Sequence, residues 1–229
     1  MTQVALTFYA MSSNKHRVKQ PTANVYVDGF NLYYGALKGT LYKWLDLDAL
    51  FRTLLPSHQV KRIRYFTARI SARPDNPGSP TRQDTYVRAL GTLPNVTVHL
   101  GKFLQSNVRM LLAQPKANGP KTVEVIKTEE KGSDVNLATY LLIDAFRRDC
   151  DLAVVVSNDS DLCEPIRIVK DEFGVPVALL IPHNRTSQAL SKLRPAFIKQ
   201  IRRGPLSASQ FPPQLLDSSG RKINKPAQW

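Results

Sequence analysis

The sequence predicts an α/β fold with a mainly parallel central sheet. Candidate strands alternate with candidate helices along most of the 229 residues, which is the pattern of parallel strands joined by helical connections. The later candidate strands, residues 152–156 and 175–181, are apolar on both faces, as strands covered by helices on both sides are. A small β-hairpin is expected as an insertion in this fold.

The first half of the predicted domain begins with a strand that ends at Asp28. A helical or turn-like segment follows over residues 30–38. Apolar residues at helical spacing predict a helix over residues 45–55, which Pro56 ends. A β-rich stretch, a proline-rich loop and a further helix are expected over residues 60–70, 74–80 and 82–90.

The second half contains the predicted hairpin and the strongest helix. Three short strands are indicated over residues 96–104, 108–112 and 122–128. Residues 133–148 carry apolar side chains at helical spacing, with Ser133 as the expected N-cap. A strand, a helix, a strand, a short helix and an edge strand should follow over residues 152–156, 161–173, 175–181, 187–193 and 196–201.

The two ends of the chain are expected to lie outside the folded domain. Residues 1–22 become polar after residue 11 and predict a disordered leader. Residues 204–229 are rich in Pro, Ser, Gly and Gln and predict a mobile basic tail. One domain with a sizeable core is therefore expected over residues 23–203.

The charge balance points to a polyanionic partner. The chain holds 32 Lys and Arg against 18 Asp and Glu, a formal net charge of +14. Such a chain is expected to be attracted to nucleic acid first and to an anionic membrane surface second. No apolar stretch approaches the roughly 20 residues that a spanning helix needs, so no membrane partner is expected. The two cysteines and four histidines show no zinc spacing, which favours the cytoplasm and a metal held by oxygen ligands.

Aspartates stand where an open parallel sheet binds its ligands, outside the carboxyl ends of the strands. Asp28 ends the first strand, Asp159 and Asp161 follow the first of the two apolar strands, and Asp134 opens the strongest helix. Each has a structural explanation of its own, as a turn former or a first-turn acid that interacts favourably with a helix dipole. Brought together without cations they would repel one another, and Mg²⁺ or Mn²⁺ suits such a set of carboxylates.

Three motifs around these aspartates resemble those of the NYN domain family of PIN-like nucleases. They are Tyr26-Val-Asp28-Gly-Phe-Asn31, Glu130-Lys-Gly-Ser-Asp134-Val and Val156-Ser-Asn-Asp159-Ser-Asp161-Leu. Their order and spacing are similar to those of single-domain bacterial members, over residues 22–203. The resemblance implies a Rossmann-like, PIN-type three-layer fold, a Mg²⁺ or Mn²⁺ centre, and processing or degradation of RNA.

The resemblance also implies roles for individual residues. Asn31 would orient a metal-bound water or a substrate phosphate, and Ser157 would support the metal shell. Lys131 would either contact a phosphate or neutralise the two glutamates before it. The metal ligands and catalytic acids would be Asp28, Asp134, Asp159 and Asp161.

Two positions depart from the pattern of the family. Asn158 stands where the family often has Gly, and Leu162 where it often has Phe. Asn tolerates a left-handed backbone better than most residues, so the turn is still expected to form. Neither change removes a metal ligand.

Candidate contacts to nucleic acid lie around the proline-rich loop and after the first motif. Aromatic residues after that motif are candidates for stacking on bases. For Tyr33 and Trp44 a place in the core is the stronger expectation. The candidate cations are Arg69, Arg73 and Arg82, and the candidate aromatics are Tyr33, Tyr34, Tyr42 and Trp44.

Three functions are compatible with these residues. A metal-dependent ribonuclease accounts for both the acids and the basic charge, and an RNA-binding or regulatory module without efficient catalysis would keep the same residues. A phosphatase of small phosphoesters is disfavoured, because position 30 is Phe where that class would have a second Asp. The sequence leaves open RNA or DNA as substrate, endo- or exonucleolytic cutting, and whether a homodimer forms.

Overall fold

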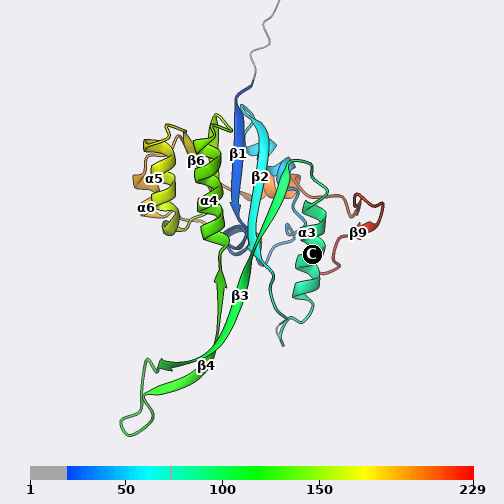
Figure 1. Cartoon of the computed structure of the whole chain (residues 1–229). Helices are drawn as coiled ribbons and strands as arrows, with labels where there is room; N and C mark the ends of the chain where they lie inside the picture. Colours follow the sequence, from blue (N-terminus) through cyan, green and yellow to red (C-terminus); the bar gives the residue numbers. More distant parts are fainter. Residues whose placement is uncertain (1–19, 73) are drawn as a thin grey trace, which may run out of the picture.

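The computed structural model describes residues 20–72 and 74–229. Seven strands form one sheet in the order β4-β3-β2-β1-β5-β6-β7. Neighbouring strands are parallel except for β3 and β4, which are antiparallel. Helices lie on both faces of this sheet (Figure 1). The expected three-layer α/β fold with a mainly parallel sheet is confirmed.

The strands are β1 (Thr22–Asp28), β2 (Gln59–Ala68), β3 (Val96–Leu111), β4 (Thr122–Lys131), β5 (Leu152–Val156), β6 (Val177–Ile181), β7 (Ile198–Gln200), β8 (Gln214–Leu216) and β9 (Lys222–Asn224). The helices are α1 (Gly29–Leu32), the π-helix η1 (Tyr33–Leu37), α2 (Leu47–Leu54), α3 (Ser79–Leu90), α4 (Ser133–Phe146), the 3₁₀ helix η2 (Ser160–Leu162), α5 (Cys163–Asp171), α6 (Gln188–Lys192) and α7 (Arg203–Ala208).

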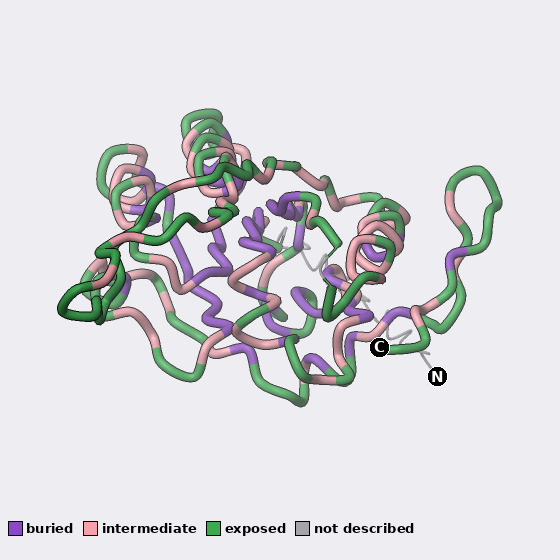
Figure 2. Tube along the Cα trace, turned by 90° about the horizontal axis from the view of Figure 1, so that it is seen from below, coloured by how far each residue is buried: buried purple, intermediate pink, exposed green. Residues whose placement is uncertain are grey.

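Side chains of the central strands alternate between two cores, because successive residues of a strand point to opposite faces. In β1, Val25 and Val27 belong to the core that is shared with α2 and α3, whereas Tyr26 belongs to the core under α4 and α5. The buried residues gather along the central strands, with exposed helical surfaces around them (Figure 2). The two cores fix β1 and β5 as the centre of the molecule.

The register of β1 and β5 positions the candidate site. The strands are parallel, and Val27 is paired with Val156. The residues that follow these two positions, Asp28 and Ser157, therefore emerge side by side at the same edge of the sheet. The prediction that chemistry gathers at this edge depends on that register.

The hairpin differs from the prediction in one respect. Residues 96–104 and 108–112 belong mostly to a single strand, β3, and are not two strands. The ladder with β4 runs without a break from the pair Lys102 and Lys131 to the pair Leu111 and Thr122. Gln105-Ser106-Asn107 includes neither Gly nor Pro to interrupt it. The result is a long two-stranded arm that projects from the body (Figure 1).

The mobile tail expected after Arg203 is instead folded onto the body. It forms α7 and the hairpin of β8 and β9, and it buries Leu206, Phe211 and Ile223. The ring of Trp229 lies 6.3 Å from that of Trp44, which is fully buried. The prediction of a mobile tail is wrong because the few apolar residues of this otherwise polar segment are enough to pack against the core that contains Trp44. Trp44 has the core role that was favoured over base stacking.

Up to residue 19, the predicted leader lies outside the described residues. In the part of the chain that the structure describes, no helix has the length and apolar character needed to cross a bilayer.

Candidate active site

Asp28 is held at the end of β1 as a buried, hydrogen-bonded carboxylate. It is 6% exposed, and its side chain accepts a hydrogen bond of 2.9 Å from the backbone N–H of Asn31, which caps α1. Gly29 follows because a Cβ there would lie 2.7 Å from the carbonyl oxygen of Phe66 and the ring of Tyr65. Burial raises the pKa of Asp28, although hydrogen bonds from Asn31 and Ser157 oppose that shift.

A chain of hydrogen bonds joins the ends of β1 and β5. The Ser157 hydroxyl donates to Asp28 Oδ2 at 2.9 Å and accepts from the backbone N–H of Asp159 at 3.1 Å. The Asn31 side-chain oxygen accepts from the backbone N–H of Asn158 at 3.0 Å. Ser157 and Asn31, both predicted site residues, therefore bind protein groups that fix the two loops.

Asp159 and Asp161 open the short helix η2. The Asp159 carboxylate accepts a hydrogen bond of 2.9 Å from the backbone N–H of Asp161 and so caps this helix. Asp159 is half-buried, whereas Asp161 is exposed. Asp159 therefore also has a structural role, as the N-cap of η2. This role occupies one carboxylate oxygen and leaves the other for further contacts.

Asp134 approaches the same edge from the first turn of α4. Burial, and then the negative charges of Asp28, Asp159, Glu130 and Asp161, raise the pKa of Asp134 to about 6. Charges act on a neighbouring pKa over short distances, so the carboxylate of Asp134 lies near those of Asp28 and Asp159. The fold therefore brings the predicted acids toward one another, and the charges of the other three raise the pKa of Asp134.

The start of α4 is built differently from the prediction. Ser133 was expected to be the N-cap, but that position is taken by Gly132, in a left-handed conformation with φ 100°. The Ser133 backbone N–H and hydroxyl both donate to the Glu130 carboxylate, at 3.1 and 2.7 Å. Glu130 thus does the capping from the end of β4. A Cβ at Gly101 would collide with that carboxylate, so Gly101 leaves room for it.

The donor set fits a hard divalent cation in kind. It consists of carboxylate oxygens from Asp28, Asp134, Asp159 and Asp161, which is the ligand type that Mg²⁺ and Mn²⁺ prefer. Among residues 20–72 and 74–229, no group of three or more His, Cys, Asp or Glu side chains is arranged so that it could hold a metal ion. The aspartates therefore match such an ion in the type of their ligand atoms, and they lie near enough to one another to raise the pKa of Asp134.

The predicted cations have other partners or fall outside the described residues. Arg69 forms an exposed ion pair of 2.7 Å with Asp84 of α3. The Lys131 ammonium lies 3.7 Å from Glu129, which favours the neutralising role that was one of its two expected roles. Arg73 lies outside the described part of the chain. Contacts from these residues to a substrate stay predictions.

Asn158 has a role that the sequence reasoning missed. Its amide donates to the carbonyl oxygen of Arg185 at 3.1 Å, and its side-chain oxygen accepts from the backbone N–H of Ser187 at 2.7 Å. Asn158 does not use the left-handed backbone that was expected, since the described non-glycine residues with positive φ are Arg148 and Arg194. The presence of Asn where the family often has Gly was the available signal in the sequence. The Asn158 side chain connects the loop after β6 to the candidate site.

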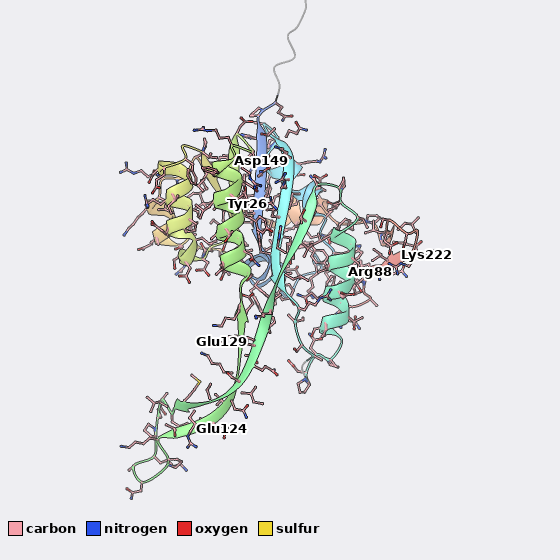
Figure 3. All side chains as sticks on the ribbon, in the orientation of Figure 1. Tyr26, Arg88, Glu124, Glu129, Asp149 and Lys222 are labelled. Atoms are coloured by element: carbon pink, nitrogen blue, oxygen red, sulfur yellow. The ribbon has the colours of Figure 1, made fainter. Side chains whose placement is uncertain are left out.

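A second acidic cluster, also missed, lies near the opposite end of α4 (Figure 3). Arg64 donates to both oxygens of the buried Asp144, at 2.8 and 2.9 Å, and the Tyr26 hydroxyl donates to it at 3.0 Å. Arg62 lies 3.5 Å from Asp144 and 3.2 Å from Asp149. The alternation of Arg62 and Arg64 in β2 was the sequence signal for these ion pairs. They fasten α4 to the sheet.

Known proteins are similar to this chain in fold or in sequence. A solved structure of a protein of unknown function from Vibrio parahaemolyticus, VPA0982, aligns with a TM-score of 0.51 at 18% identity, over 84% of this chain and 97% of that one. A protein from Pseudomonas putida named 6-hydroxy-3-succinoylpyridine 3-monooxygenase HspA is 32% identical over 234 residues, which is 90% of this chain and 74% of that protein. The NYN domain model matches residues 22–201, so this chain belongs to the NYN domain family.

Proposed function

We propose that this protein is a divalent-metal-dependent nuclease that hydrolyses phosphodiester bonds, in RNA more than in DNA. The observation that carries the proposal is the meeting of Asp28, Asp134 and Asp159 at the carboxyl edge of β1 and β5. None of the ion pairs among the described residues includes these acids. A cluster of uncompensated carboxylates is costly unless a cation binds there.

Mg²⁺ or Mn²⁺ would supply the missing charge and, when bound, would activate water and stabilise the leaving oxygen. Asp28, Asp134, Asp159 and Asp161 would hold the ion. Ser157 and Asn31 keep the two strand ends at a fixed distance. Membership of the NYN domain family supports a nuclease, and the formal net charge of +14 supports a polyanionic substrate.

The direct test is hydrolysis of single-stranded RNA, structured RNA and single-stranded DNA with Mg²⁺ or Mn²⁺. Asp28→Asn and Asp159→Asn should each lower the rate by more than the roughly 10–100-fold that changes behind a metal ligand cost. Asp171→Asn is the matched control, because Asp171 is an exposed acid of α5 that pairs with Lys170. It should cut at the wild-type rate.

Metal binding gives a readout that does not depend on cleavage. At a metal concentration about 100 times its Kd, the wild type should gain about 2.7 kcal/mol of stability, measured by thermal unfolding. The two site variants should lose most of that gain, and Asp171→Asn should keep it. A wild type that binds RNA but cuts nothing with either metal would instead be the RNA-binding module considered as the alternative.

The relative from Pseudomonas putida supports a second candidate, hydroxylation of a small aromatic acid. The name of that protein, at 32% identity over most of this chain, is the observation in its favour. A monooxygenase places one atom of O₂ in the substrate and reduces the other to water with two electrons from a reductant. Oxygen uptake with a reduced nicotinamide and hydroxypyridine acids, followed by mass analysis of the product, tests it. Uptake coupled to a hydroxylated product, without RNA cleavage, would reverse the order of the two candidates.

A further inference from the structure

The arm is a surface without a core of its own. We define it as residues 102–131, the span in which β3 and β4 pair with each other. From Gly91 to Gly132, all of which the structure describes, no residue is buried. Figure 1 shows the arm leaving the body, and Figure 3 shows Glu129 near its root and Glu124 farther out. Its distal residues therefore pack only against one another.

Exposed apolar side chains are concentrated on the arm. Six of the 14 exposed large apolar residues in the described chain belong to it, namely Leu104, Met110, Leu111, Leu112, Val123 and Ile126. They lie on both faces of the ribbon. Met110 is paired with Val123 on one face, and Leu111 and Ile126, 81% and 72% exposed, lie on the other. Such a cluster is unusual for a surface that stays in water.

An isolated two-stranded ribbon is only marginally stable in water, and three or more strands or a packed face are needed for stability. Both edges of the arm are also open, because β2 pairs with β3 only up to Gly101 and the outer side of β4 faces no strand. Open edges with apolar side chains readily pair with another strand. The arm thus has the properties of a surface that is completed by another polypeptide.

We infer that the arm is a self-association surface whose partner is the arm of a second copy of this chain. The open outer edge of β4 favours a second copy, because it can pair with the same edge of another chain in a two-fold antiparallel arrangement. Glu129 contacts Lys127 at 2.8 Å and Lys131 at 3.7 Å within its own chain, and this arrangement can also place it opposite a lysine of the partner.

Nucleic acid is the less suitable occupant of this surface. It cannot pair with open strand edges or cover aliphatic side chains such as Leu111 and Ile126. Recognition of bases favours aromatic side chains, and the only aromatic residue of the arm, Phe103, is engaged at its root by Phe30 with ring centroids 5.8 Å apart. The inference does not depend on the proposed nuclease activity.

The test is the mass of the full chain in nucleic-acid-free solution, by light scattering or sedimentation from about 1 to about 100 µM. The wild type should reach twice the chain mass of 25.7 kDa. Met110→Lys combined with Ile126→Lys, one change on each face, should stay at 25.7 kDa with an unchanged circular dichroism spectrum. Leu41→Lys, a change at a 77% exposed residue outside the arm, is the matched control and should still double its mass.

Hydrogen exchange of the unmodified wild type tests the same inference without a substitution. Backbone amides of residues 105–111 and 122–128 should exchange more slowly at high than at low protein concentration. A wild type that stays at 25.7 kDa over the whole range, or an arm variant that still doubles, would overturn the inference. So would an arm variant that keeps its mass behaviour but loses affinity for RNA, which would assign the arm to nucleic acid.

Discussion

An acidic cluster lies at each end of α4, and the two clusters differ in whether cationic side chains pair with the acids. At the C-terminal end, the carboxylate of Asp144 is 1% exposed and paired with Arg64 and Arg62. At the N-terminal end, Asp134 faces Asp28 and Asp159 without an ion pair among the described residues. The first cluster is compensated within the chain, and the second lacks positive charge. A helix fastened at one end by ion pairs can present an unpaired acid at the other.

This difference separates residues that hold the fold from residues available for chemistry. Acids whose charge is balanced by arginine leave no need for an external cation. Acids without a cation, such as those that raise the pKa of Asp134, create such a need, and this makes the N-terminal end of α4 the candidate site. Both clusters consist of ordinary aspartates, so residue type alone does not distinguish them.

The largest effect is expected on breaking the compensated cluster with Asp144→Asn. The change leaves Arg64, whose side chain is 11% exposed, without its two charged contacts. Removing one partner of a buried ion pair costs about 3–5 kcal/mol. Urea unfolding monitored by circular dichroism measures the loss.

Asp28→Asn is the control for this experiment, because it removes a buried acid that has no cation. It should cost less stability than Asp144→Asn: the new amide can accept only one of the two hydrogen bonds, but burial already disfavours the charged form of Asp28. An additional change of Arg64→Met in the Asp144→Asn variant should recover part of the lost stability, since the unpaired charge is then gone. A smaller loss for Asp144→Asn than for Asp28→Asn would contradict the comparison.

Sequence patterns predicted the fold well where local and long-range signals agree. The strand at residues 152–156 is β5 without any shift of its ends, because an apolar run bounded by Asp151 and Ser157 is buried on both faces. The patterns failed where pairing or distant packing decides. β3 continues across a polar stretch because β4 pairs with it. The C-terminal tail folds because it packs over Trp44, whose indole N–H donates to the carbonyl oxygen of Pro212.

The aspartates of the candidate site were predicted from their positions after strands or at the start of a helix. The residues that hold these segments in place were not predicted. Glu130 caps α4 from the preceding strand only because Gly132 turns the chain back through a left-handed conformation. The pairing of Arg64 with Asp144 joins residues 80 positions apart. Such contacts depend on the three-dimensional arrangement of α4 on the sheet, which no spacing in the sequence encodes directly.

A smaller effect is expected at Asn158, which joins the uncompensated cluster to the loop at residues 185–187. Asn158→Ala removes two hydrogen bonds and should cost about 1–2 kcal/mol. Hydrogen exchange of residues 183–187 should become faster, while that of β1 stays unchanged. Asn158→Gly, the residue that resembles the family pattern, should cost more than Ala, because Gly also gains freedom in the unfolded chain. Equal protection of the loop in all three proteins would remove this role.

The smallest effect is expected on the pH dependence of stability, where substitution of an acid should change Tm by about 2 °C. The direction of this change should differ between the two clusters. The pKa of Asp134 is raised from 3.8 to about 6, so the folded state holds its proton more tightly than the unfolded state. In metal-free buffer, its ionisation therefore destabilises the protein as pH rises from about 4 to about 6. Asp134→Asn should have the wild-type Tm near pH 4 and a higher Tm at pH 7.

Asp149 should behave in the opposite way. Burial alone would raise its pKa, but Lys61, Asn24 and Arg62 outweigh burial and lower it. Its ionised form therefore stabilises the fold above its ordinary pKa, and that stability is lost as pH falls through the lowered value. Asp149→Asn should thus have a lower Tm than the wild type at pH 7, and the difference should shrink in acid. If the two substitutions shifted Tm in the same direction at pH 7, the two ends of α4 would not differ in charge compensation. The reason for placing the metal at the N-terminal end of α4 would then be gone.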